Sequence, residues 1–282
     1  MSLSPPDAEY LRSVVMRNSG NHVDPSRDYL FESRLQRLLR ARGLASLYEL
    51  IAALRTEKGS MLQRSVAEAM TINETSFFRD LPTFDLLRRE LLPALLARRN
   101  PVRALRFWSA GCSSGQEAWS LAMMLREDFP LLGSWKIDIL GTDISVEMVE
   151  RARDARYQRI EINRGLPARL LVQYMVRSGD AWEICRELRR LCRFQQGNLC
   201  DPPLRQETFD IILLRNVMLY FSEKTRRQVL LRVHQSLAPD GALLLGLSEQ
   251  PRMDSHWQTV LTSNAVWYRP VAAGDADAAR HA

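Results

Sequence analysis

Two polar features follow short apolar runs, at the positions where an open α/β sheet binds its ligands. The run 104–110 (ALRFWSA) precedes the glycine turn 111–117 (GCSSGQE), which lets a ligand approach the backbone closely. A second run, 136–143, ends in Asp143, a carboxylate that can accept both hydroxyls of a ribose. Each feature alone has a structural explanation, as a plain strand–helix turn and as an acid that caps the next helix. Together they favour a cofactor that contains a nucleoside.

The glycine spacing distinguishes between two kinds of nucleoside cofactor, dinucleotides and cofactors without phosphates. A dinucleotide fingerprint, GxGxxG, would place its third glycine inside the start of the helix, and this chain has none there. S-adenosylmethionine (SAM) therefore fits better than NAD, because SAM has a ribose and an adenine but no phosphates.

Two further polar segments could contribute to such a site. Arg215 and Asn216 follow the apolar run 209–214 (FDIILL), where a buried Arg–Asn pair is costly without partners; the alternative is a solvated strand end. The segment 71–80 (TINETSFFRD) is too polar for a core helix. It is either part of the site or an interdomain linker with a helix cap.

The composition is that of a globular protein with an excess of arginine. The 282 residues include 39 basic and 33 acidic side chains, and all but three of the basic residues are arginine. This excess of arginine has two explanations. One is a genome that favours arginine codons, and the other is attraction to an acidic partner, either nucleic acid or protein. The four cysteines and four histidines lack CxxC, HxH and HxxxH spacing, so no metal site is expected.

No apolar run of the sequence is long enough to span a bilayer, and no secretory signal is visible. We therefore expect a cytoplasmic protein without membrane insertion.

The chain divides into two parts with different periodicity. Up to residue 70, leucines recur at helical spacing and predict an all-helical domain. Over residues 101–270, apolar strands alternate with amphipathic helices, which predicts a parallel sheet with helices on both faces. The predicted strands are 104–110, 136–143, 191–196, 209–214, 242–247 and 266–269, and the predicted helices are 116–125, 146–155 and 223–237.

Three shorter regions complete the division. Residues 71–100 are assigned to a linker that contributes to the site. Residues 164–190 interrupt the alternation, and WEICR at 182–186 has the alternation of a small strand, so we expect an inserted β-subdomain near 170–194. The tail 271–282 is rich in Ala, Asp and Gly and is expected to be disordered.

Taken in order, the motifs resemble the CheR family of chemotaxis receptor methyltransferases. The matching blocks cover roughly residues 70–268: TINETSFFRD, FWSAGCSSGQEAWSLAM, ILGTDIS, GNL and FDIILLRNVMLYF, then LAPDGALLLGLSEQ. The resemblance implies a Rossmann-like class I SAM-dependent methyltransferase sheet after an all-helical N-terminal domain. It also implies a protein-glutamate O-methyltransferase that acts on the cytoplasmic helices of chemoreceptors and releases S-adenosylhomocysteine (SAH).

The resemblance further implies which residues bind the cofactor. In the linker, SAM would contact Asn73 and Thr75, together with Arg79. Glu117 would hold the amino end of the methionine part, and Asp143 would take the ribose.

The remaining cofactor contacts implied by the resemblance come from later strand ends. Asn198 and Leu199 would border the adenine, and Arg215 and Asn216 would complete the site.

The acceptor glutamate would be ionised near neutral pH, because its reference pKa is about 4.3, so no general base is required. Arg79 would steer its carboxylate and Tyr220 would hydrogen-bond it. An arginine-rich helix would steer acidic receptor helices, or is merely a solvated face; its candidate contacts are Arg34, Arg37, Arg40 and Arg42.

One departure from the family concerns how a receptor is captured. Some members carry an extension in the small β-subdomain that docks a C-terminal receptor pentapeptide, whereas here the turn 177–182 (RSGDAW) is short. The chain thus resembles the pentapeptide-independent members.

Two alternatives remain beside the receptor methyltransferase. One is a non-catalytic adaptor that binds SAM. The other is a nucleic-acid methyltransferase, motivated by the basic charge and by DPP at 201–203, which we interpret as a turn. The preferred hypothesis includes no nucleic-acid partner.

Overall fold

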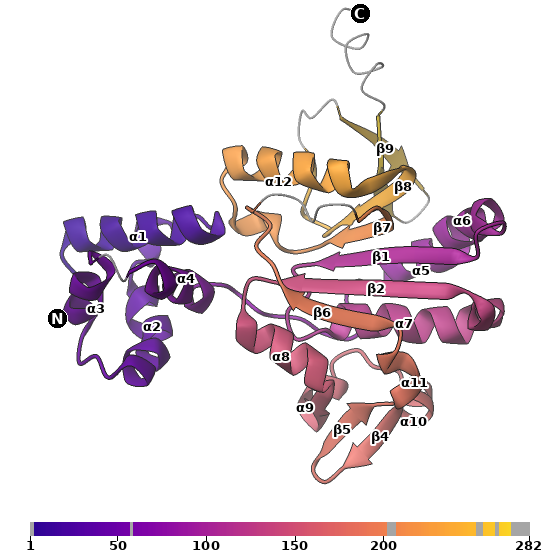
Figure 1. Cartoon of the computed structure of the whole chain (residues 1–282), viewed down its shortest axis with the longest axis horizontal. Coiled ribbons are helices and arrows are strands. Elements are labelled where there is room, and N and C mark those ends of the chain that lie inside the picture. Colours follow the sequence, from indigo (N-terminus) through magenta and orange to yellow (C-terminus); the bar gives the residue numbers. More distant parts are fainter. Residues whose placement is uncertain (1–2, 57–58, 202–206, 252–255, 263–264, 272–282) are drawn as a thin grey trace, which may run out of the picture.

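The computed structural model describes residues 3–56, 59–201, 207–251, 256–262 and 265–271. Over these ranges the chain forms a helical domain and an α/β domain, joined by an extended segment (Figure 1). The predicted disordered tail, beyond Val271, lies outside the described residues. So do Pro202 and Pro203 of the predicted DPP turn.

The N-terminal domain is all-helical, as predicted. Glycines in the left-handed conformation end two of its helices, Gly20 at φ 73° and Gly43 at φ 65°. Its core includes Leu11, Phe31 and Leu50, all fully buried. The helices are α1 (Pro5–Ser19), α2 (Tyr29–Arg42), α3 (Leu47–Leu54) and α4 (Gly59–Ala69).

The α/β domain contains a seven-stranded sheet in the order β6-β2-β1-β7-β8-β10-β9. The first five of these strands run parallel. The bounds of β1, β2 and β7 are those predicted. The strands are β1 (Ala104–Ala110), β2 (Lys136–Asp143), β6 (Cys192–Gln196), β7 (Phe209–Leu214), β8 (Leu237–Leu245), β9 (Trp257–Leu261) and β10 (Val266–Pro270).

The expectation of a wholly parallel sheet is wrong at one edge. Strand β10 pairs antiparallel with β8, and β9, which was not predicted, pairs antiparallel with β10. A parallel connection needs a crossover of a dozen or more residues. Only residues 262–265 separate β9 from β10, so these two strands form a hairpin.

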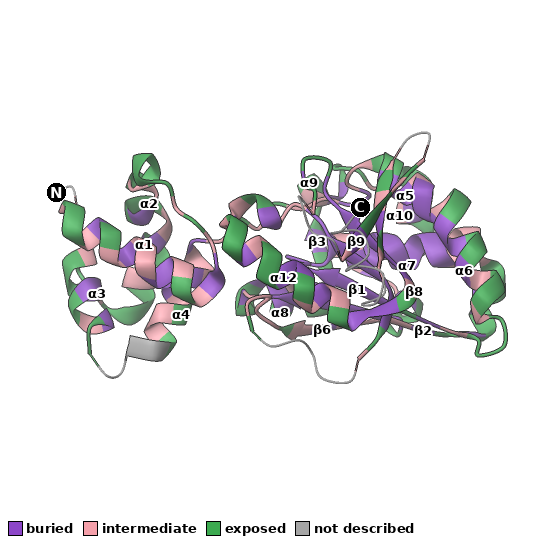
Figure 2. Ribbon diagram, turned by 90° about the horizontal axis from the view of Figure 1, so that it is seen from above, coloured by how far each residue is buried: buried purple, intermediate pink, exposed green. Residues whose placement is uncertain are grey.

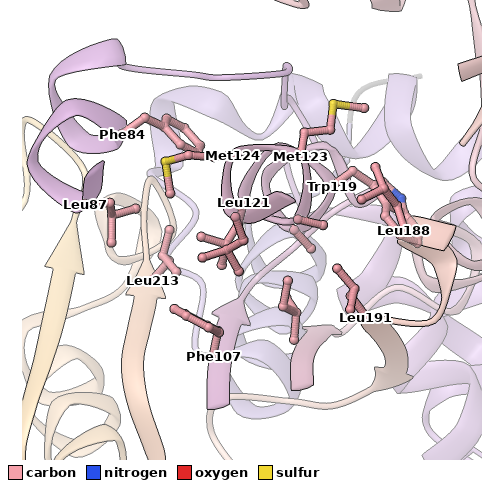
Figure 3. Packing of buried hydrophobic residues seen from close by; sticks show 14 of the residues in the cluster. Phe84, Leu87, Phe107, Trp119, Leu121, Met123, Met124, Leu188, Leu191 and Leu213 are labelled. Atoms are coloured by element: carbon pink, nitrogen blue, oxygen red, sulfur yellow. The ribbon is translucent and has the colours of Figure 1, made fainter. Parts of the chain in front are cut away.

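Two apolar clusters cover the two faces of the sheet. Alternate residues of β1 point to opposite faces, so Phe107 belongs to the cluster that contains α7 (Gln116–Asp128) and Trp108 to the cluster that contains α12 (Glu223–Ser236). Figure 3 shows α7 packed above Phe107 and Leu213. Helices therefore cover both faces, as predicted, and buried residues fill the sheet while the outer helix faces are exposed (Figure 2).

The predicted linker 71–100 contains two kinds of structure. Residues 71–80 cross between the domains, whereas the rest forms a helical stretch: α5 (Leu81–Leu86), the π-helical turn η2 (Leu87–Leu91) and α6 (Leu92–Arg99). Phe84, Leu87 and Leu92 of that stretch are buried in the α7 cluster. Residues 81–99 are thus packed as part of the α/β domain.

An inserted subdomain interrupts the α/β alternation after α8 (Val146–Asp154). Its sheet has the antiparallel order β3-β5-β4. The one strand predicted there, 182–186, overlaps β5 over residues 182–184, but residue 186 begins α11. The subdomain begins earlier than the predicted residue 170, because β3 is paired with β5. Its elements are β3 (Arg156–Gln158), α9 (Arg159–Ile162), α10 (Ala168–Tyr174), β4 (Met175–Ser178), β5 (Ala181–Ile184) and α11 (Arg186–Arg189).

Candidate active site

A pocket lies at the carboxyl ends of the parallel strands, where the helical domain and the segment 71–80 meet the sheet. Ligands bind at this edge in open α/β sheets. All ten residues predicted to bind the cofactor or the acceptor line the pocket: Asn73, Thr75, Arg79, Glu117, Asp143, Asn198, Leu199, Arg215, Asn216 and Tyr220.

The glycine turn is shaped by close backbone packing. Gly111 has φ 80°, and a Cβ on it would lie 2.5 Å from Val217 Cγ2 in the loop after β7. The Ser113 hydroxyl donates to the Asn73 carbonyl over 2.8 Å and ties the segment 71–80 to the turn. The turn therefore brings three chain segments together around one wall of the pocket.

Asp143 is fixed at the tip of β2 by two backbone N–H groups. Its Oδ2 accepts from Ser113 N over 2.8 Å and its Oδ1 from Ser145 N over 2.9 Å. Burial raises the pKa of Asp143, and these hydrogen bonds oppose the rise. The alternative role as a helix cap is taken mainly by Ser145, whose side chain accepts from Met148 N at the start of α8. Each carboxylate oxygen retains a lone pair for a ribose hydroxyl.

Arg215 forms a buried ion-pair network behind the pocket. Its Nη1 donates to Glu117 Oε2 and its Nη2 to Asp80 Oδ2, both over 2.8 Å, while only 1% of its side chain is exposed. Nη2 also donates to the Arg79 carbonyl over 2.6 Å. Glu117 Oε1 accepts a second bond from Ser109 Oγ over 2.7 Å. Arg215 thus orients Glu117 and holds the end of the segment 71–80.

Asn216 lines the pocket in the left-handed conformation, with φ 60°. Its N–H donates to Glu249 Oε2 over 2.6 Å, and the same oxygen accepts from Gly246 N over 2.8 Å. Glu249 is 5% exposed. Glu249 was not among the predicted site residues, although it is a charged residue shortly after the buried apolar strand β8.

Arg79 and Tyr220 come from two different parts of the chain, the segment 71–80 and the loop after β7, and both line the pocket. Arg79 Nη1 donates to the Glu74 carbonyl over 3.0 Å. Among the residues that the structure describes, no carboxylate forms an ion pair with Arg79. Tyr220 lies in the short 3₁₀ turn 218–220 after β7 and is partly exposed. Both side chains are available to a substrate.

The charged residues around the pocket fit SAM. Three acids and two arginines line it: Glu74, Glu117, Asp143, Arg79 and Arg215. An excess of carboxylates suits the sulfonium and ammonium charges of SAM and disfavours the phosphates of a dinucleotide. When bound, SAM supplies an electrophilic methyl group.

The four arginines predicted on α2 have different surroundings. Arg34 Nη1 donates to the Met70 carbonyl over 2.9 Å, and Arg37 pairs with Glu147 of α8 over 2.8 Å. Arg40 and Arg42 are exposed. Two of the four therefore make contacts within the chain, and two face outward.

Pocket residues from the helical domain were missed by the sequence analysis. Ser19 and Asn21, at the end of α1, line the pocket. Nothing in their local sequence marks them, because their place depends on how the two domains meet.

Across the described ranges, no group of three or more His, Cys, Asp and Glu side chains is arranged to hold a metal ion. Within the same ranges, no helix combines the length and apolar character needed to cross a membrane.

The sheet order, the glycine turn and the acid at the tip of β2 together define a class I SAM-dependent methyltransferase. Residues 73–266 match the family model "CheR methyltransferase, SAM binding domain", and residues 6–81 match "CheR methyltransferase, all-alpha domain". The chain therefore belongs to the CheR methyltransferase family.

Curated relatives agree with this assignment. "Chemotaxis protein methyltransferase 1" of Pseudomonas aeruginosa is 36% identical over 274 residues, which are 95% of this chain and 99% of the relative. "Chemotaxis protein methyltransferase Cher2" of Pseudomonas putida is 35% identical with the same coverage. "Chemotaxis protein methyltransferase" of Vibrio parahaemolyticus is 38% identical over 229 residues, 79% of this chain and 82% of the relative. This chain is similar to each of them over most of its length.

Replacing Asp143 with alanine is expected to weaken SAH binding by roughly 10- to 100-fold, because the hydrogen bonds expected from two ribose hydroxyls to its carboxylate oxygens are lost. Isothermal titration calorimetry with SAH measures this effect. Asp154→Ala, an exposed acid at the end of α8, is the matched control and should bind SAH as the unmodified chain does. A thermal melt establishes whether the Asp143 variant is folded. If the folded variant binds SAH as tightly as the unmodified chain, the role of Asp143 in ribose binding is contradicted.

Proposed function

We propose that this chain transfers the methyl group of SAM to glutamate side chains on the cytoplasmic helices of chemoreceptors. The products are glutamate methyl esters and SAH, and the proposed location is the cytoplasm. The relatives' names support a chemotaxis substrate. The observation that carries the acceptor assignment is Arg79, a pocket cation without an ion pair among the described residues.

The proposed reaction is a direct displacement at the sulfonium methyl. A glutamate carboxylate is ionised near neutral pH, so no general base is needed to deprotonate it. The protein must align the carboxylate oxygen at about 3 Å from the methyl group and exclude water. In this proposal Arg79 steers the carboxylate and Tyr220 donates a hydrogen bond to it. Over-tight pairing with Arg79 would stabilise the ground state, so its role is positioning.

The remaining predicted residues hold the cofactor in this proposal. Asp143 receives the ribose hydroxyls, and Glu117, held by Arg215, receives the methionine ammonium group. Asn198 and Leu199 border the adenine. The linker residues Asn73 and Thr75, and Asn216 after β7, would complete the enclosure.

We further propose that receptors are captured without a pentapeptide tether. Strands β4 and β5 are joined by only two residues, Gly179 and Asp180, and Gly179 has the left-handed φ of 61° that a tight hairpin requires. This short connection supports a hairpin without a docking extension. In its absence, the exposed arginines of α2 would contribute the recognition of acidic receptor helices.

Reversing two charges on α2, Arg40→Glu with Arg42→Glu, is expected to raise the KM for receptor by about tenfold at low salt and to leave kcat unchanged, because these side chains steer docking and do not touch the reacting atoms. The matched control is Arg89→Glu, an exposed arginine in η2, at the far side of the α/β domain from α2 (Figure 1). Equal KM changes in both proteins would indicate a general charge effect and would contradict docking on α2.

The experiment that tests the proposed function is the transfer of radiolabelled methyl from SAM to membranes that contain the host's chemoreceptors. Label that is removed by alkali, as an ester is, and that is absent from receptor-free membranes is the expected result. DNA and RNA are tested as acceptors in parallel. Label on nucleic acid, or no label on receptors despite SAM binding, would overturn the proposal.

A further inference from the structure

The end of α1 reaches across the domain boundary to the cofactor pocket. Ser19 is 4% exposed, and it lines the pocket together with Asn21. Both belong to the helical domain, which otherwise packs around its own core. The wall of the pocket is therefore made by both domains.

Backbone hydrogen bonds attach this turn, Ser19–His22, to the loop after β7. The His22 N–H donates to the Tyr220 carbonyl over 2.7 Å, and Asn21 forms an antiparallel bridge with Phe221. Tyr220 is a residue that we place nearest the acceptor. The position of the Ser19–His22 turn is thus coupled directly to the loop that carries Tyr220.

A second set of contacts attaches the end of α1 to the loop after β6. Asn198 Nδ2 donates to the Asn18 carbonyl over 2.7 Å, and Cys200 Sγ lies 3.5 Å from the Ser19 carbonyl. Asn198 also lines the pocket, at the end where we place the adenine. The end of α1 and the turn that follows it therefore contact both ends of the proposed cofactor site.

The approach of the two domains is close enough to require glycine at position 20. Gly20 has φ 73°, and a Cβ added to it would lie 2.5 Å from Thr225 Cγ2 and 2.6 Å from Cys200 Sγ. Real Cβ atoms do not approach other atoms that closely, so a larger residue requires Thr225 and Cys200, or α1 itself, to move.

Across the part of the chain that the structure describes, the other polar contacts between the domains are few and weak. Arg37 and Glu147 form an exposed ion pair, with 82% and 50% of their side chains accessible. Glu68 of α4 accepts from Val146 N and Gln196 Nε2, each over 3.4 Å. An exposed pair contributes little to stability, so these contacts alone hold the domains together weakly.

We propose that bound SAM or SAH holds the helical domain closed on the α/β domain, through the Ser19–His22 turn that lines the pocket. A ligand that contacts both domains binds the closed arrangement better than the open one and shifts the population toward it. Closure also fixes α2 relative to Tyr220. The importance of that arrangement for methyl transfer rests on the receptor docking proposed above, whereas the predictions for SAH binding do not depend on it.

Gly20→Ala tests the proposal through SAH affinity. We expect binding of SAH to weaken by roughly tenfold, a typical size for coupling between a ligand and a conformational change. Gly43→Ala is the matched control. It places alanine in the same left-handed conformation, at the end of α2 in the same domain, with no atom within 4 Å of its Cβ, so its affinity for SAH should change less than about twofold.

Rescue separates crowding at Gly20 from backbone strain. The variant Gly20→Ala with Thr225→Ser and Cys200→Ala removes both atoms that the new Cβ would meet, and the serine keeps the hydroxyl that contacts Ser222. Its affinity should return to that of the Thr225→Ser, Cys200→Ala protein. Unchanged SAH binding in Gly20→Ala, an equal loss in Gly43→Ala, or failure of the rescue would each overturn the proposal.

A measurement on the unmodified chain covers the case in which Gly20→Ala does not fold. Hydrogen exchange of the His22 amide, which donates to the Tyr220 carbonyl, is compared with and without saturating SAH. The proposal predicts slower exchange with SAH, because the closed arrangement is more populated. An exchange rate that SAH does not change would contradict it.

Discussion

Replacing Arg215 with methionine is expected to lower the free energy of unfolding by about 3 kcal/mol, because it leaves two largely buried carboxylates, 13% and 21% exposed, without their cation. Glu117 and Asp80 lose an arginine whose side chain is 1% exposed. The Arg79 carbonyl loses a donor as well. Denaturant unfolding, followed by the fluorescence of the buried tryptophans, measures the change. SAH affinity should fall too, because Glu117 loses its fixed orientation.

Arg193→Met is the matched control for that prediction. Arg193 also pairs with two carboxylates, those of Asp138 and Glu207, but 38% of its side chain is exposed. Its loss should therefore cost about 1 kcal/mol or less. A similar cost for the two arginines would contradict the claim that burial makes the Arg215 network important.

Replacing Arg79 with alanine is expected to slow methyl transfer by roughly 100-fold while SAH affinity changes by less than about threefold. The guanidinium forms no ion pair among the described residues, although the hydrogen bond from Arg164 and, less strongly, the charge of Arg79 lower the pKa of Glu74. Glu117 and Asp143 are the proposed anchors for the cofactor. Losing Arg79 should thus leave the cofactor bound and the acceptor misaligned. Single-turnover transfer to receptor, beside calorimetry with SAH, measures the two quantities separately.

Arg164→Ala is the control for Arg79. Arg164 is also an arginine beside the segment 71–80, where it pairs with Glu74 over 2.7 Å at the surface. It does not line the pocket, so transfer should proceed as in the unmodified chain. If Arg79→Ala lost SAH binding and transfer to the same extent, Arg79 would act only as the cofactor ligand that the resemblance implies, and its proposed role toward the acceptor would be wrong.

Part of the pocket could be predicted from the sequence because a simple geometric rule applies, whereas Asn73, Thr75, Arg79, Asn198 and Leu199 were implied only by the family resemblance. Asp143 ends one strand of a parallel sheet and Arg215 follows another, and the carboxyl ends of such strands meet at one edge. The strands themselves were recognisable where a short apolar run stops at a polar or glycine residue, as β1 does before Gly111 and β7 does before Arg215.

Features that depend on contacts between distant segments could not be predicted in this way. Arg215 was assigned to the cofactor, but the structure adds ion pairs to Glu117 and Asp80, which lie 98 and 135 positions away in the sequence. Ser19 and Asn21 reach the pocket through the packing of two domains. No local pattern contains this information, because periodicity describes only the face of one element at a time.

The antiparallel edge was missed for a local reason. The residues of β9 carry polar side chains at Gln258 and Thr259, and both are exposed. An edge strand needs only one well-packed residue, here Trp257, which is 7% exposed. Alternation over so few positions is too weak to distinguish an edge strand from a loop.

The measurement that tests the central claim most directly uses two purified receptor cytoplasmic fragments, identical except that the candidate glutamates of one are replaced by glutamines. Radiolabelled SAM is added with this chain, and alkali-labile label is counted on each fragment. The account predicts label on the glutamate fragment alone, because only a carboxylate can accept the methyl group as an ester. Equal label on both fragments, or none on the glutamate fragment while SAM binding is measurable, would contradict it.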